Sequence, residues 1–230
     1  MFFDPVYLLF VMPGILLGLW ATFKTRTTFD RYSHVESAKR ITGAEAASRL
    51  LSGAGIHDVR IEETDGFLSD HYDPAAKVLR LSPGVYHSDS IAAIGVAAHE
   101  TGHALQYEYG YGPIKIRSAI LPATQFATTV SPYMILIGLL TAFEWLAIAG
   151  VAFFGLSVVF QLLTLPVEFN ASSRALKALG DGGLLTSAEL PGAKKVLRAA
   201  AMTYVAALFV SLMSLIRLII LLGGRGRRDR

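Results

Sequence analysis

Long apolar segments dominate the pattern of hydrophobic and polar positions along the chain. Pro5 to Phe23 contains no charged residue and is followed by Lys24 and Arg26. A helix needs about 20 residues to cross the roughly 30 Å hydrocarbon core of a bilayer, so segment 5–23 predicts a transmembrane helix. A cleaved signal peptide is the alternative, but its basic residues would precede the apolar stretch, and here they follow it.

Two further apolar segments lie in the second half of the chain. From 118 to 167 the only charged residue is Glu144. This stretch is too long for one crossing, so we expect a transmembrane helical hairpin over 118–166, with Glu144 and Trp145 at the far interface. A fourth predicted helix, either transmembrane or membrane-associated, covers 199–222, and a basic tail follows at 223–230. The pattern therefore predicts about four transmembrane helices.

The polar segment 24–117 has the mixed patterning of a small folded domain. The expected elements are a helix capped by Thr42, a strand at 59–62, a hairpin formed by 66–73 and 77–81, and a helix at 89–106 capped by Ser88 or Asp89. Helices and strands together predict a small α+β domain between the first two membrane helices.

Composition and charge narrow the class of protein. Hydrophobic residues make up 53% of the chain and charged residues 17%, against about 45–50% and about 25% in soluble domains. The chain has no cysteine, so a metal ion could be bound only by His, Asp or Glu. The net charge of +3 comes largely from the C-terminal tail, which suits lipid headgroups. No basic stripe with interleaved aromatic residues is present, so we do not expect nucleic-acid binding.

The predicted helix at 89–106 contains the sequence H-E-T-G-H at positions 99–103. His99 and His103 are one turn apart on the same face, so both rings can reach one ion. Glu100 points about 100° away and could contact a water molecule bound to that ion. This is the arrangement of zinc metalloproteases. The alternative is a pair of surface histidines, but the surrounding residues are apolar, and burying unpaired histidines is costly.

A catalytic zinc site needs a third protein ligand. The candidates downstream are Glu108, Glu144, Glu168, Asp181 and Glu189. Glu168 is the best placed, because it follows Pro166, where the hairpin returns to the side it left. The sequence P-V-E-F-N-A-S-S predicts the start of a helix in a second loop at 167–198. The alternative role for Glu168 is a weak interfacial salt bridge with Arg174.

The pair of motifs H-E-T-G-H-A-L-Q and P-V-E-F-N-A-S resembles the bacterial YugP-like integral-membrane zinc metallopeptidases. That resemblance implies a gluzincin-like site, with His99, His103 and Glu168 as zinc ligands and Glu100 as the catalytic base. HtpX-like and CAAX-processing peptidases carry Asp four residues after the ligand Glu, where this chain has Ser172. Asn170 and Ser172 are therefore the candidates for orienting the histidines.

We expect a mainly α membrane protein with about four transmembrane helices and a small α+β zincin-like domain at the membrane surface. The expected function is zinc-dependent endopeptidase activity on a peptide or membrane-protein substrate, which could pair with an edge strand near 77–81. The alternatives are a site-2-type intramembrane protease and a membrane scaffold with a structural zinc site. Basic residues in both loops predict a multi-pass protein of the cell membrane with a cytoplasmic site. The sequence predicts neither the substrate nor the oligomeric state.

Overall fold

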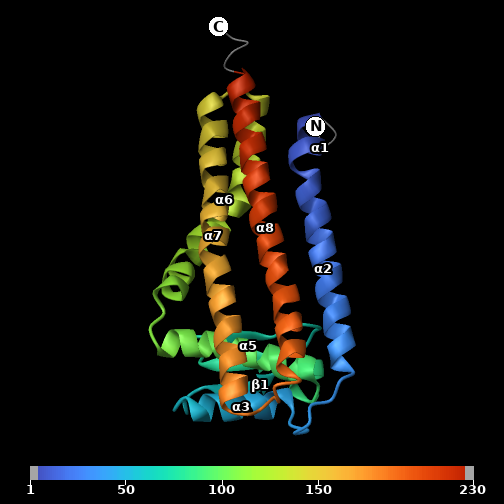
Figure 1. Cartoon of the computed structure of the whole chain (residues 1–230). Helices are drawn as coiled ribbons and strands as arrows, with labels where there is room; N and C mark the ends of the chain where they lie inside the picture. The colour runs from blue at the N-terminus through green and yellow to red at the C-terminus, as the bar shows by residue number, and fades with distance from the viewer. Residues whose placement is uncertain (1–4, 226–230) are drawn as a thin grey trace. The chain divides into compact units, whose positions relative to one another are not determined.

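The structure, a computed structural model, describes residues 5–225 of the chain (Figure 1). The helices are α1 (Pro5–Phe10), α2 (Met12–Ser33), α3 (Gly43–Gly53), α4 (Pro83–Tyr86), α5 (Ile91–Glu108), α6 (Gly112–Leu140), α7 (Glu144–Asp181) and α8 (Leu190–Arg225). The strands are β1 (Arg60–Glu63), β2 (His71–Asp73) and β3 (Val78–Leu81). The protein is therefore a mainly α membrane protein with a small α+β part, which confirms the predicted fold class.

Four helices are long and apolar enough to cross a membrane. They cover Tyr7–Ser33, Gly112–Leu140, Glu144–Asp181 and Leu190–Gly224. Each extends beyond the apolar segment that predicted it. Of the predicted basic tail at 223–230, the residues from 226 onward lie outside the described residues.

The prediction that a new helix starts after Pro166 is wrong, because α7 continues through Pro166 to Asp181. A proline inside a helix removes one backbone donor, and the residues that follow, rich in Ala, Leu, Lys and Arg, favour continuation of the helix. The fourth long helix also begins earlier than expected, at Leu190 instead of 199. The predicted loop at 167–198 is thus mostly helical.

The chain forms two compact units. Among the described residues, the membrane unit comprises 5–21, 115–165 and 203–225, and the site unit comprises 22–114 and 166–202.

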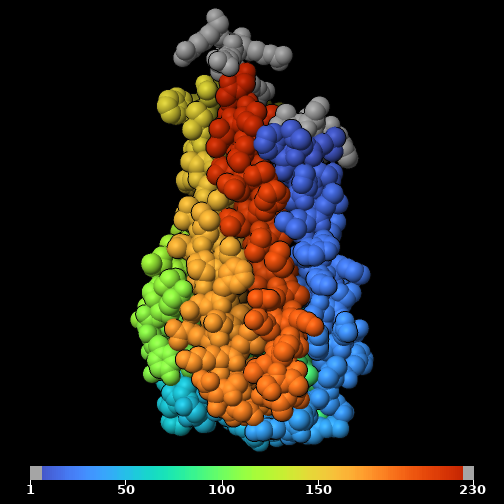
Figure 2. Space-filling model, viewed as in Figure 1, coloured from blue at the N-terminus to red at the C-terminus, as the bar shows by residue number. Residues whose placement is uncertain are grey.

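Small residues allow close helix packing within the membrane unit. A Cβ atom on Gly138 of α6 would lie 2.5 Å from the backbone nitrogen of Ala147 in α7. A Cβ atom on Gly14 of α2 would lie 2.9 Å from the Val210 side chain of α8. Small residues at such contacts are typical of membrane helices, which gain little from the hydrophobic effect and depend on close packing. Within this unit the surfaces of α2, α7 and α8 lie side by side on the face shown in Figure 2.

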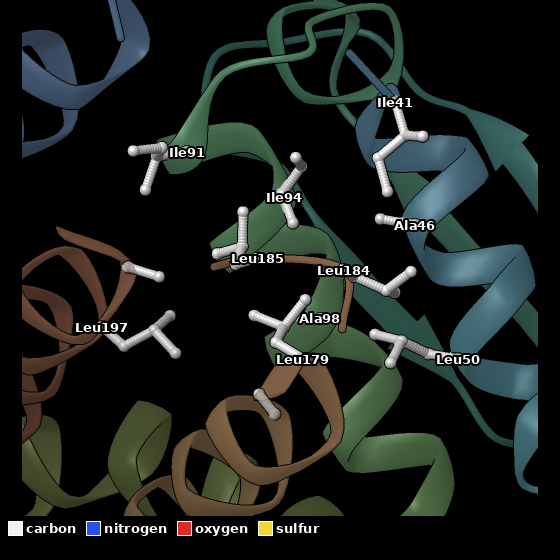
Figure 3. Packing of buried hydrophobic residues seen from close by; sticks show 12 residues of the cluster. Ile41, Ala46, Leu50, Ile91, Ile94, Ala98, Leu179, Leu184, Leu185 and Leu197 are labelled. Atoms are coloured by element: carbon white, nitrogen blue, oxygen red, sulfur yellow. The ribbon is translucent and has the colours of Figure 1, made fainter. Parts of the chain in front are cut away.

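The core of the site unit gathers apolar residues from four helices (Figure 3). Ile94 and Ala98 of α5 lie at its centre, packed against Leu50 of α3, Leu179 of α7 and Leu197 of α8. Each buried Leu or Ile side chain contributes about 1.5–3 kcal/mol relative to its exposed state. This core holds α5 and the end of α7 together, and those two helices carry the candidate metal ligands.

The sheet has the order β1-β3-β2, with β1 parallel and β2 antiparallel to β3. The predicted hairpin is present, but β2 is shorter than expected and begins at His71. The prediction that 77–81 is an edge strand is wrong, because β3 lies between the other two strands. Val78, Leu79 and Leu81 are fully buried, and a nearly continuous apolar run is typical of a strand covered on both faces.

Helix caps follow the local sequence. Thr42 caps α3, as predicted, and it also forms a reciprocal capping box with Glu45. The cap of α5 is Ser90, whose hydroxyl accepts a hydrogen bond from the Ala93 amide, so the prediction of Ser88 or Asp89 is wrong. Helix α5 runs to Glu108, two residues beyond the predicted end at 106.

Candidate metal centre

Helix α5 presents His99 and His103 one turn apart, with their ring centroids separated by 4.8 Å. Glu168 of α7 lies against both rings. Its Oε2 atom is 3.2 Å from Nε2 of His99 and 3.6 Å from Nε2 of His103. The candidate ligand atoms of the three residues lie within 4.8 Å of one another. The structure therefore brings the three residues that the sequence proposed as ligands into one cluster.

A glycine and an alanine allow α5 and α7 to approach closely enough for this cluster to form. A Cβ atom on Gly102 would lie only 2.5 Å from the carbonyl oxygen of Ala171. Ala171 is fully buried and follows Glu168 on α7 by less than one turn. Any larger residue at 102 would push α7 away and withdraw the Glu168 carboxylate from the histidines.

Gln106 connects the two helices by hydrogen bonds. Its Oε1 atom lies 3.0 Å from Nδ1 of His103. Its Nε2 atom donates to the Val167 carbonyl oxygen at 2.8 Å and to Oδ1 of Asn170 at 3.1 Å. The glutamine is fully buried. The sequence analysis did not identify it, although its position three residues after His103 on the same helix face indicates such a contact.

Ser172 contacts the other histidine. Its hydroxyl oxygen lies 3.1 Å from Nδ1 of His99. Ser172 was one of the two predicted orienting residues. The second, Asn170, contacts Gln106 instead of a histidine ring. The Nδ1 atom of each histidine thus has a polar partner, which leaves both Nε2 atoms facing Glu168.

Arg174 does not take the alternative role of salt-bridge partner to Glu168 that the sequence left open. Its Nε atom donates to Asn170 Oδ1 at 2.7 Å. Its guanidinium group lies over the rings of Tyr109 and Tyr111, at 5.7 and 5.8 Å from their centroids. Glu168 pairs instead with the two histidines.

The other acidic candidates lie elsewhere. Glu108 is exposed at the end of α5, Glu144 begins α7 in the membrane unit, and Asp181 is exposed at the end of α7. The Glu189 carboxylate accepts hydrogen bonds from the Thr186 amide and hydroxyl and from the Ala38 amide. Among the described residues, Glu168 is the one of the five that joins the histidine cluster.

The electrostatic environment of the cluster favours a cation. Burial lowers the pKa of His103, but its hydrogen bond to Glu168 and the charge of Glu100 outweigh this effect and raise the pKa above its ordinary value. Glu100 is only 9% exposed, and its burial raises the pKa of its carboxyl group. Two acidic groups beside two imidazoles stabilise positive charge at this position.

Two imidazole nitrogens and one carboxylate oxygen form the ligand set of a catalytic zinc site with an open fourth position. The buried hydrogen-bond partners at both Nδ1 atoms suit this use, because they fix each ring with Nε2 toward the ion. The residues present therefore fit zinc, and His99, His103 and Glu168 are the residues that would hold it.

The fold and the site together describe a membrane protein with a cluster of two histidines and one carboxylate that could hold a metal ion. Over residues 7–223 the chain matches the family described as "Putative neutral zinc metallopeptidase". It is also 46% identical over 221 residues to the "Putative membrane protease YugP" of Bacillus subtilis (strain 168). The aligned region covers 96% of this chain and 98% of that relative. No solved structure matches the chain. The chain belongs to this zinc metallopeptidase family, as its motifs implied.

Proposed function

We propose that the protein is a zinc-dependent endopeptidase that hydrolyses a peptide or membrane-protein substrate at the membrane surface. The observation that carries this proposal is the convergence of His99, His103 and Glu168, with Glu100 next to the first histidine. A gluzincin-type ligand set of this kind, when loaded, supplies a Lewis acid that polarises the scissile carbonyl group and acidifies a water molecule.

Glu100 acts as the general base. Its carboxylate takes a proton from the attacking water and returns that proton to the leaving amine. Burial suits this role, because it raises the pKa of Glu100 and so makes the carboxylate a stronger base. Gln106 and Ser172 hold the imidazole rings in place while this proton moves.

The membrane topology that best fits this function has four crossings. The four long apolar helices support a multi-pass protein of the cell membrane. Basic residues in the loops 24–117 and 167–198 favour the cytoplasmic side for the site. Helix α5 is distinct from these four helices, which favours hydrolysis at the membrane surface over an intramembrane protease.

An extended substrate requires a free strand edge, and the sheet offers β1 and β2 instead of the predicted β3. Strand β2 is the better candidate, because its Tyr72 packs on Tyr107 of α5, the helix that carries His99 and His103. The centroids of the two tyrosine rings are 5.8 Å apart. Backbone pairing with β2 would lay a peptide along the same helix as His99 and His103.

The test compares purified full-length wild type, Glu100→Gln, Glu168→Ala and the surface control Asp181→Asn, at the exposed end of α7. Bound zinc is measured by elemental analysis, and hydrolysis is measured with fluorescein-labelled casein. We expect Glu100→Gln to keep zinc and to lose activity by about 10²–10⁴-fold. Glu168→Ala should lose zinc and activity together, and Asp181→Asn should retain both.

Two outcomes would overturn the proposal. If Glu168→Ala retains zinc undiminished, Glu168 is not the third ligand. If the wild type binds zinc but cleaves no faster than Glu100→Gln, the site is a structural zinc site of a membrane scaffold.

A further inference from the structure

A second candidate site lies in the site unit between α7 and α8. The structure has a pocket of about 410 Å³ there, within the size range of small-molecule sites. Helix α7 contributes Phe169, Ser172 and Leu176, and α8 contributes Lys194, Leu197 and Arg198. The pocket therefore combines an apolar surface with two cationic side chains.

The charges in this pocket favour an anion. Lys194 and Arg198 are four residues apart on one helix face, and both are exposed. None of the residues lining the pocket is acidic. Among the described residues, no carboxylate forms an ion pair with either cation. Arginine and lysine at this spacing suit a phosphate group, which arginine can bind with two parallel hydrogen bonds.

The pocket lies at the ends of two apolar segments. The uncharged stretch of α7 ends at Val167, and that of α8 begins at Ala199. At about 1.5 Å of rise per residue, Phe169 and Arg198 lie within about 3 Å of those ends, and Lys194 lies within about 8 Å. The headgroup layer occupies about 5–8 Å on each side of the hydrocarbon core. In a bilayer bounded by these apolar ends, lipid phosphates would lie at the depth of these two cations.

The pocket also has an exposed apolar surface, because Phe169 lines it and is 47% exposed. We propose that the pocket binds the headgroup phosphate of an anionic phospholipid, with Lys194 and Arg198 on the phosphate and Phe169 against the first part of the acyl chain. A free phosphate ion would satisfy the cations but would leave this apolar surface uncovered.

The lipid would lie behind the metal centre instead of in the path of a substrate. Ser172 lines the pocket and contacts Nδ1 of His99, whereas Nε2 of that ring faces Glu168. An occupant of the pocket thus approaches His99 from the side opposite the reacting groups. The proposal concerns binding and holds whether or not the protein cleaves peptides.

The test measures how much phosphatidylglycerol and phosphatidylcholine the purified full-length protein retains from mixed micelles, by native mass spectrometry. The pocket variant is Lys194→Gln with Arg198→Gln. The control, Lys177→Gln with Lys195→Gln, removes the same charge from exposed positions outside the pocket. We expect the pocket variant to retain about fivefold less phosphatidylglycerol than wild type, equivalent to about 1 kcal/mol, and the control to change by less than about twofold.

A third variant changes the shape of the pocket without changing its charge. Ser173 is exposed and lines the pocket, so Ser173→Leu should also lower phosphatidylglycerol retention. Equal retention by the pocket and control variants would overturn the proposal. The proposal also fails if delipidated protein binds inorganic phosphate through Lys194 and Arg198 without retaining lipid. It fails as well if the pocket variant changes only the KM for casein, which would indicate a substrate site.

Discussion

Gln106 and His103 form a hydrogen-bonded pair on α5, with 3.0 Å between Oε1 and Nδ1, and the same glutamine donates to the Val167 carbonyl group of α7 at 2.8 Å. Val167 immediately precedes Glu168. One side chain therefore fixes the ring orientation of one candidate ligand and the backbone next to another. Gln106 is fully buried and His103 is 9% exposed, so water cannot readily replace these hydrogen bonds.

Replacing Gln106 should weaken metal binding more than it weakens the fold. Gln106→Leu keeps the volume of the side chain but leaves the His103 ring without its acceptor. Losses of this kind typically lower metal affinity by about 10–100-fold. Competition with a zinc chelator measures the change in the full-length protein. Gln125→Leu, on the exposed face of α6, is the control and should keep wild-type affinity. Equal affinities for the two variants would exclude a role for Gln106.

Replacing Ser172 should weaken zinc binding through His99, as replacing Gln106 does through His103. The loss of affinity should be smaller, because a hydroxyl group is a weaker acceptor than an amide oxygen. Ser172→Ala removes the contact to Nδ1 and should lower zinc affinity by about tenfold. Ser173→Ala changes the neighbouring exposed serine and should leave affinity unchanged. The same chelator titration compares them, and a Ser172→Ala variant with wild-type affinity would contradict the prediction.

The proximity of the candidate ligands could be predicted from the sequence. His99 and His103 are four residues apart on one helix, so their proximity follows from helix geometry alone. Glu168 was predicted because the apolar tract between the motifs is long enough to return the chain to the same side. Gln106 was missed because its bonds to Val167 and Asn170 join residues 61 and 64 positions apart. Such contacts depend on how two helices pack.

Strand order and helix continuity were harder to predict for related reasons. The central position of β3 depends on parallel pairing with β1, and the alternation within one strand does not reveal its neighbours. Pro166 indicated a helix boundary, but the backbone continues through it in α7. The residue pattern therefore predicted the existence of the elements better than it predicted their order and their ends.

Gly102 should be sensitive to the addition of a single methyl group. The Cβ atom of Gly102→Ala would lie 2.5 Å from the Ala171 carbonyl oxygen, so α5 and α7 would have to separate. Overpacking of this kind costs about 1–3 kcal/mol and should also reduce bound zinc. Gly53→Ala is the control, because a Cβ atom there meets nothing within 4 Å. Thermal unfolding with zinc analysis tests both variants, and wild-type zinc content in Gly102→Ala would contradict this account of the helix contact.

Glu189 should stabilise the segment around Ala38 in a pH-dependent way. Burial alone would raise the pKa of Glu189, but hydrogen bonds from Thr186 and Ala38 outweigh it and hold the pKa below 4.5. A depressed pKa in the folded state means that the stabilisation is present above pH 4.5 and is lost as the pH falls through the folded-state value.

Hydrogen exchange of the Ala38 amide, which donates to the Glu189 carboxylate at 2.7 Å, measures this local stabilisation. At pH 7, the Ala38 amide in the Glu189→Gln variant should exchange about five- to tenfold faster than in wild type or in the control Glu108→Gln, equivalent to about 1 kcal/mol. Well below pH 4.5 the difference should vanish, and a difference independent of pH would show that the carboxylate charge is not what holds this segment.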